Sequence, residues 1–159
     1  MMRRLIATIS LSAAALVGIV VSEGYTDRAV IPVPGDVPTI GFGTTEGVKM
    51  GETTTPPKAL ARALQDVGRY EGAVRQCVKV PLHQHEYDAY VSLAYNIGSR
   101  AFCGSTLVRK LNAEDYPGAC LEILRWDRFR GQPLRGLTIR REREYRQCIG
   151  EAGSGGALQ

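Results

Sequence analysis

The pattern of hydrophobic and polar residues divides this chain into three stretches. An uncharged, mostly apolar run extends from Leu5 to Ser22, directly after two arginines. Residues 25–55 are rich in glycine, proline and threonine, with short β-branched runs, and this pattern predicts a small sheet with tight turns. From residue 56 onward, apolar side chains recur at intervals of three and four, as on one face of a helix. The order of these elements predicts a helix-dominated α+β fold.

Start and stop signals divide the last two thirds of the chain into helices. Thr55 is placed to cap a long first helix, with Pro56 at its first position, and Pro81 follows its end. Gly98 is expected to close the second helix and Ser105 to cap the third. The expected helices are one of about 20 residues from Pro56, then 82–96, 106–111, 116–125 and 137–148, and the expected strands are Val37 and 40–42.

The N-terminal run has the length of a marginal membrane span. Its 18 residues would measure about 27 Å as a helix. They include nine Leu, Ile or Val, but also Ala, Gly, Ser and Thr, which weaken insertion. The run is either a cleavable signal peptide, with small residues at 12–15, or an uncleaved weak anchor. We favour the anchor, because cleavage there would leave Leu16–Val21 as an apolar N-terminus.

Composition and charge add two constraints. With 44% hydrophobic and 23% charged residues, the chain is typical of a globular protein. We expect a segment at 1–22, one folded domain at 23–149 and a flexible tail at 150–159. The net charge of +4 is concentrated at 125–146, where eight arginines face three acidic residues. Such a surface suits an anionic polymer, such as nucleic acid, anionic lipid or an acidic glycan, unless it is only a solvated helix face.

The four cysteines indicate disulfides rather than a metal site. They form no C-x-x-C pair, and His83 and His85 do not face each other on a helix, so we expect no zinc and no other metal. Both interpretations of the N-terminus predict export, where disulfides form. Cys103 begins the turn into the third expected helix and Cys120 lies mid-way along the fourth. Two short adjacent helices could bring them together, so we predict that they pair with each other. Cys77 is then left for Cys148.

The candidate chemistry begins at Glu23, the first charged residue after the apolar run. Thr39 follows 16 residues later, in a strand beside Gly41 and Gly43 that turns sharply. A carboxylic acid can donate a proton to a leaving group, and a threonine hydroxyl can hold the attacking water. The water also needs an acceptor, and the nearby carboxylates are Asp27, Asp36 and Glu46.

These residues carry a family resemblance. Glu23-Gly24, followed by Thr39-Ile-Gly-Phe-Gly-Thr-Thr45, resembles the active-site signature of phage lysozymes of glycoside hydrolase family 24. The likeness covers nearly all of 23–148, and the N-terminus is similar to that of signal-arrest-release endolysins. It continues through VSLAYNIG at 91–98, STLVRKLN at 105–112, Arg125-Trp126 and 136–144.

The resemblance implies a lysozyme-like fold, in which a long helix joins a small β lobe to a helical lobe. It implies an endolysin that hydrolyses, with inversion, the β-1,4 bond between N-acetylmuramic acid and N-acetylglucosamine in peptidoglycan. No cofactor, metal or nucleic acid takes part, and the protein is expected to be a monomer. It would be exported, held at the inner membrane by its N-terminal segment and then released into the periplasm of the host cell.

One member of the family's catalytic set is missing. The set is a glutamate, an aspartate nine positions later and a threonine six beyond that. Glu23 and Thr39 match, but Pro32 stands at the aspartate position and the spacing is one residue longer. Asp36 is the carboxylate nearest to Thr39 in sequence, and we predict that it serves the water. Alternatively, Thr39 and the backbone hold the water alone, and Asp27 is a third choice.

The missing aspartate leaves a second function class open. The chain could be a catalytically impaired, membrane-tethered protein that binds peptidoglycan on the same fold. A third class, a basic protein whose last helix disrupts membranes, is disfavoured because Glu142 and Glu144 interrupt the positive face of that helix.

Overall fold

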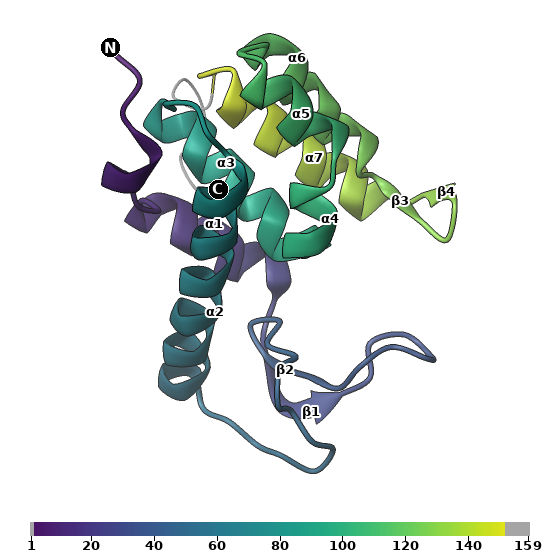
Figure 1. The fold of residues 1–159 in the computed structure, drawn as a ribbon. Coiled ribbons are helices and arrows are strands. Elements are labelled where there is room, and N and C mark those ends of the chain that lie inside the picture. Colours follow the sequence, from purple (N-terminus) through teal and green to yellow (C-terminus); the bar gives the residue numbers. More distant parts are fainter. Residues whose placement is uncertain (1, 152–159) are drawn as a thin grey trace. The chain divides into compact units, whose positions relative to one another are not determined.

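The computed structural model describes residues 2–151 (Figure 1). Most of the expected tail, 150–159, therefore lies outside the described residues. The chain forms two compact units: Leu16–Arg69, and Met1–Ala15 together with Tyr70–Gln159. Two helices, α1 (Ala13–Glu23) and α2 (Pro56–Cys77), contribute residues to both units. Helices dominate and the sheets are small, as the sequence predicts.

The first unit contains a two-stranded antiparallel sheet. Strand β1 (Thr26–Val30) pairs with β2 (Thr39–Gly41). The register shifts within β1, so that more residues lie between the paired positions in β1 than in β2. Ala29, Ile40 and Val48 form a small core. The sequence predicted β2 but not β1, because only Ala29 of that strand is buried. Backbone bonds to residues 52 and 54, distant in sequence, hold β1 in place.

Helix α2 begins at Pro56 as predicted and continues to Cys77. The apolar positions of its predicted stripe at Ala59, Ala63, Val67 and Val74 are buried. Leu60 and Leu64, which the sequence placed in the same stripe, are 45% and 57% exposed, so the hydrophobic periodicity identified only part of the buried face.

The second unit is helical. Tyr87, Tyr90 and Leu93 are fully buried in its core, as their spacing predicts. Gly98 ends the second predicted helix, and the Ser105 hydroxyl accepts a hydrogen bond from Val108 N–H at the start of the third. The elements are α3 (Gln84–Ile97), α4 (Ser99–Cys103), α5 (Thr106–Asn112), α6 (Tyr116–Glu122), the 3₁₀ turn η2 (Ile123–Arg125), β3 (Arg128–Phe129), β4 (Gln132–Pro133) and α7 (Arg135–Cys148).

The residues before α1 are part of the helical unit. After the 3₁₀ turn η1 (Ile6–Thr8), Ile9 is 1% exposed within the core of that unit. The Ser12 hydroxyl donates to the buried carboxylate of Asp88 at 2.7 Å, and Leu11 N–H donates to Glu71 at 2.7 Å. Among residues 2–151, no helix is long and apolar enough to cross a membrane.

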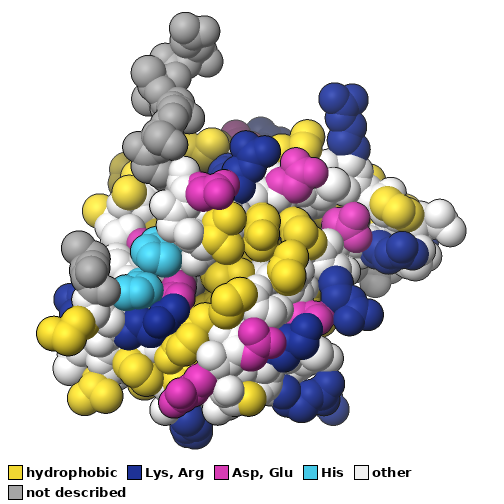
Figure 2. Space-filling view, turned by 90° about the horizontal axis from the view of Figure 1, so that it is seen from above, with side chains coloured by type: hydrophobic (Ala, Val, Ile, Leu, Met, Phe, Trp, Pro, Cys, Tyr) yellow, Lys and Arg dark blue, Asp and Glu magenta, His cyan; other side chains and the backbone are white. Residues whose placement is uncertain are grey.

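The start of α3 shows how the N-terminus is fixed. Glu86 accepts from the backbone N–H of His83 at 2.8 Å and from the guanidinium of Arg3 at 2.8 Å. The rings of His83 and His85 stack with centroids 5.1 Å apart, and Figure 2 shows the two side chains together on the surface. Burial lowers the pKa of His83, against the attraction of Glu86. Both imidazoles therefore belong to the structure of this helix end.

The predicted arginine surface is only partly correct. Arg140 and Arg141 are buried because α7 packs against α3, and both pair with Glu144 of α7 itself. Arg141 Nε lies 2.7 Å from Glu144 Oε2, and the Ser92 hydroxyl donates to Glu144 Oε1 at 2.7 Å. Arg141 also donates to Asn96, the residue that the sequence placed at a helix end. Buried charges need such pairing, and removal of one partner is expected to destabilise the unit strongly.

The predicted disulfide pairing is wrong. The structure joins Cys77 to Cys103 and Cys120 to Cys148. Cys103 lies on α4, a helix that the sequence did not predict, and its sulfur lies 3.5 Å from the carbonyl of Ala73 in α2. The core packing of α6 against α7 brings Cys120 and Cys148 together, with Cα atoms 5.7 Å apart.

Each disulfide is expected to stabilise the helical unit. The bridges close loops of 26 and 28 residues, which corresponds to roughly 3.5 kcal/mol each in the chain-entropy estimate. Replacing both Cys77 and Cys103 with alanine should lower the free energy of unfolding by about this amount, which is measured as a lower urea midpoint. Non-reducing peptide mapping checks the pairing, and recovery of a Cys103–Cys120 peptide would contradict it.

Candidate functional site

Glu23 is the last residue of α1, and its carboxyl group lies against the backbone of Gly43. Gly24 follows with a φ of +70°, which ends the helix and turns the chain into β1. A Cβ atom on Gly43 would come within 3.0 Å of Glu23 Oε2 and 3.3 Å of its Cγ. Any larger residue at 43 would adopt a disfavoured φ and would push the Glu23 carboxyl group away from the turn by a few tenths of an ångström.

The turn itself is fixed by backbone pairing. Ile40 and Thr44 exchange two hydrogen bonds, at 3.0 and 3.1 Å. Gly41 and Gly43 both have positive φ values, of 65° and 85°. A Cβ atom on Gly41 would lie 2.8 Å from the Cβ of Ala59, so this glycine lets the turn rest on α2. The two glycines thus serve different contacts, one with α2 and one with the catalytic candidate.

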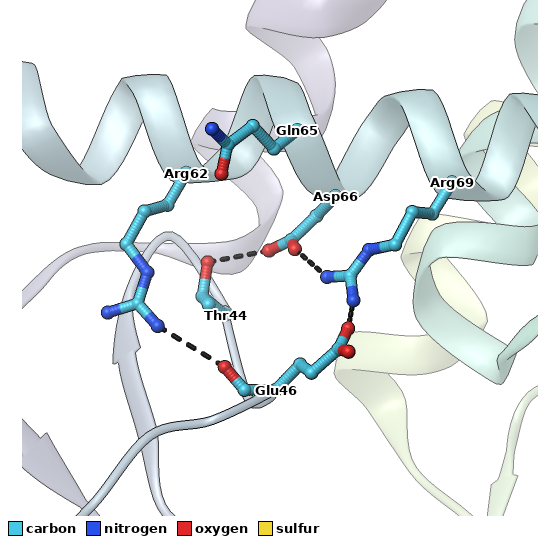
Figure 3. A pocket seen from close by; sticks show the side chains of 6 residues that line it. All are labelled: Thr44, Glu46, Arg62, Gln65, Asp66 and Arg69. Atoms are coloured by element: carbon cyan, nitrogen blue, oxygen red, sulfur yellow. Dashed lines mark hydrogen bonds and ion pairs between the residues drawn. The ribbon is translucent and has the colours of Figure 1, made fainter.

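A buried acid on α2 holds the end of this turn. The Thr44 hydroxyl donates to Asp66 Oδ2 at 2.6 Å, and Asp66 is 5% exposed (Figure 3). Arg69 reaches both Asp66 and Glu46, and Arg62 donates to the Glu46 carbonyl at 3.2 Å. These side chains line an open pocket of about 420 Å³. Burial raises the pKa of Asp66, whereas the Thr44 hydrogen bond opposes the shift.

The sequence analysis missed the contact between Thr44 and Asp66, although a signal for it exists. Asp66 lies between Ala63 and Val67, which belong to the apolar stripe of α2. An acid on a buried face must find a hydrogen-bond donor, since its desolvation is otherwise costly. The identity of that donor, Thr44, is known only from the tertiary structure.

Thr39 and Asp36, the two residues predicted to serve the water, both form hydrogen bonds with the backbone of Val37. Thr39, the first residue of β2, is half-buried and its hydroxyl donates to the carbonyl of Val37 at 3.2 Å. Asp36 is exposed, and its carboxylate accepts from Val37 N–H at 2.8 Å. Val37, predicted as strand, instead lies in the connection between β1 and β2. Asp27 is an exposed residue of β1 rather than a continuation of α1.

Comparison with known proteins decides the family. The family model described as phage lysozyme matches residues 21–144. The chain belongs to the phage lysozyme family. It is a lysozyme-type glycoside hydrolase, an endolysin that lyses peptidoglycan.

Individual relatives agree with this assignment. The lysozyme is 39% identical over 110 residues to an endolysin of Acyrthosiphon pisum secondary endosymbiont phage 1, covering 67% of this chain and 75% of that protein. It is 36% identical over 141 residues to the SAR-endolysin of Pseudomonas phage phiKMV, covering 86% and 87%. The solved endolysin from Escherichia coli O157:H7 phage FAHEc1 superposes with a TM-score of 0.77 at 33% identity, covering 90% of this chain and 95% of that one.

The contact between Glu23 and Gly43 can be tested with a matched pair of glycines. Gly43→Ala and Gly47→Ala both place a Cβ at a positive φ, of 85° and 70°, but nothing lies within 4 Å of the Cβ at 47. Both variants should lose about 1–2 kcal/mol of stability. Only Gly43→Ala should also lower kcat, by roughly tenfold to a hundredfold, because it displaces the acid. Urea unfolding and turbidity assays on peptidoglycan separate the effects, and equal kcat values would contradict the contact.

Proposed function

We propose that Glu23 is the general acid of this endolysin. It protonates the glycosidic oxygen of the β-1,4 bond between N-acetylmuramic acid and N-acetylglucosamine. A water held by Thr39 attacks the anomeric carbon from the opposite face, Asp36 accepts its proton, and the configuration inverts. The observation that carries the proposal is the Glu23 carboxyl group packed against the Gly43 turn, in the strand–turn segment that also contains Thr39. The impaired, binding-only alternative is not favoured by the endolysin relatives.

The role of Glu23 is tested with a shape-conserving substitution. Glu23→Gln should reduce glycan cleavage to background, because it keeps the size of the side chain and removes the transferable proton. The full chain must be used, since Ile9 belongs to the core and truncation would damage the fold. Circular dichroism and the urea midpoint establish that the variant is folded. A folded Glu23→Gln protein with normal activity would refute the assignment.

The water side is tested with three substitutions and one control. Thr39→Ala should lower kcat roughly 10²-fold, and Thr39→Ser, which keeps the hydroxyl, should retain most of it. Asp36→Asn should cost a similar factor. Asp27→Asn is the control, because Asp27 is an equally exposed aspartate in β1. A neutral Asp36→Asn together with a severe Asp27→Asn would show that the acceptor is Asp27.

We further propose that residues 1–22 act as a signal-anchor before release into the periplasm. Relatives named SAR-endolysins support this, as does the apolar run from Leu5 to Ser22. In the folded chain, Ile9, Leu11 and Ser12 contact the helical unit. A segment inside a bilayer cannot make these contacts. Membrane residence therefore excludes the folded arrangement, and release should precede activity.

The release proposal predicts a delay in lysis from a stronger anchor. The double variant Ser10→Leu/Gly18→Leu makes the segment more apolar. Ser10 is exposed, and a Cβ added at Gly18 would have no atom within 4 Å, so the fold can accept both changes. Ser12 is left intact because it binds Asp88. The variant should stay longer in the membrane fraction and lyse cells later, yet match the parent once purified. Val17→Leu, at an exposed and already apolar position, is the control. Membrane retention without delayed lysis would contradict the release proposal and show that the segment serves only as an export signal.

A further inference from the structure

The β3–β4 hairpin has an unusual turn. Arg130 and Gly131 form its two-residue connection, with φ values of 49° and 81°. Two successive positive φ values define the turn type that normally takes Asn-Gly or Gly-Gly. An arginine in the left-handed region costs conformational energy that asparagine or glycine would not. The sequence therefore places a guanidinium at the tip where backbone preference disfavours it.

The side chains around the tip form an exposed basic and aromatic surface. All four strand residues are exposed, and Phe129 is 43% exposed. The Arg130 guanidinium lies 5.3 Å from the centre of the Phe129 ring, within the range of a cation–π contact. Arg128 donates to the carbonyl of Gly131 across the turn, at 3.3 Å. The backbone thus presents one aromatic face and two guanidinium groups to solvent.

We propose that this tip, Arg128–Gly131, is a surface that binds the peptide-bearing strands of peptidoglycan. Guanidinium groups pair with carboxylates in a planar, two-bond geometry, and the stem peptides of the polymer carry free carboxylates. The aromatic ring offers an apolar face to the C–H groups of a sugar ring. The inference rests on the proposed function, since it takes the polymer that this enzyme cleaves as the ligand. The phosphates of an anionic lipid surface are the competing ligand, which the test addresses.

The test compares two double variants with the same loss of charge. Arg128→Gln/Arg130→Gln removes the guanidinium groups at the tip, whereas Arg143→Gln/Arg146→Gln removes two exposed arginines of α7. Turnover is measured on purified sacculi, and on sacculi whose peptide carboxylates have been amidated with methylamine. Phe129→Ala, assayed on both, isolates the ring. Co-sedimentation with phosphatidylglycerol vesicles measures lipid binding.

The expected result is a roughly fivefold rise in KM for the tip variant on native sacculi with kcat unchanged, the size expected for two exposed charge pairs. On amidated sacculi the tip variant and the parent should differ by less than twofold, while Phe129→Ala should raise KM on both. The α7 variant should remain within twofold throughout. Equal effects of the two double variants, or an unchanged difference on amidated sacculi, would overturn the proposal. So would a loss confined to vesicle binding, which would assign the tip to lipid. An inactive parent would instead refute the proposed function.

Discussion

The Glu23 carboxyl group approaches the backbone of Gly43, and this contact constrains several neighbouring elements of the smaller unit. It requires α1 to end at residue 23, so that the acid leaves the helix just before the chain turns into β1. A Cβ at 43 would displace the Glu23 carboxyl group, so glycine favours the contact. The contact also requires a rigid turn, because an acid that can shift by even 1 Å loses much of its effect on a reaction barrier. The Ile40–Thr44 hydrogen bonds and the contact of Gly41 with Ala59 provide that rigidity.

The hydrogen bond from Thr44 to Asp66 extends this constraint to α2. A buried carboxylate is costly, and a partner on the turn offsets the cost only when the turn is in place. The pair therefore makes the turn and the helix dependent on each other. The raised pKa of Asp66 reflects the same burial.

The helical unit combines covalent and polar constraints. The two disulfides fasten α2 to α4 and α6 to α7, and the buried network of Arg141 and Glu144 fixes α7 against α3. The N-terminal residues complete this unit, since Asp88 and Glu86 receive hydrogen bonds from Ser12 and Arg3. The first residues of the chain therefore satisfy two buried carboxylates of the helical unit.

The sequence by itself determined most of the helix positions, the family and the choice of catalytic candidates. Helices were predictable because periodicity and capping are local properties, as the correct ends at Pro56 and Gly98 show. Glu23 and Thr39 could be proposed as candidates because each lies in a short contiguous motif, Glu23-Gly24 and 39–45. Strand β1 could not, since its pairing partners are distant in sequence and it buries a single alanine.

Tertiary structure alone decided the rest. The cysteine pairing followed from α4, a five-residue helix too short for its periodicity to be recognised. The burial of Arg141 and the docking of Ile9 depended on which faces meet. From composition alone, Arg141 is expected at the surface and Ile9 in a membrane span. Composition reflects the solvation preference of a residue type and contains no information about its neighbours in the fold. A buried ion pair or a docked segment exists only once the rest of the chain has supplied its partners.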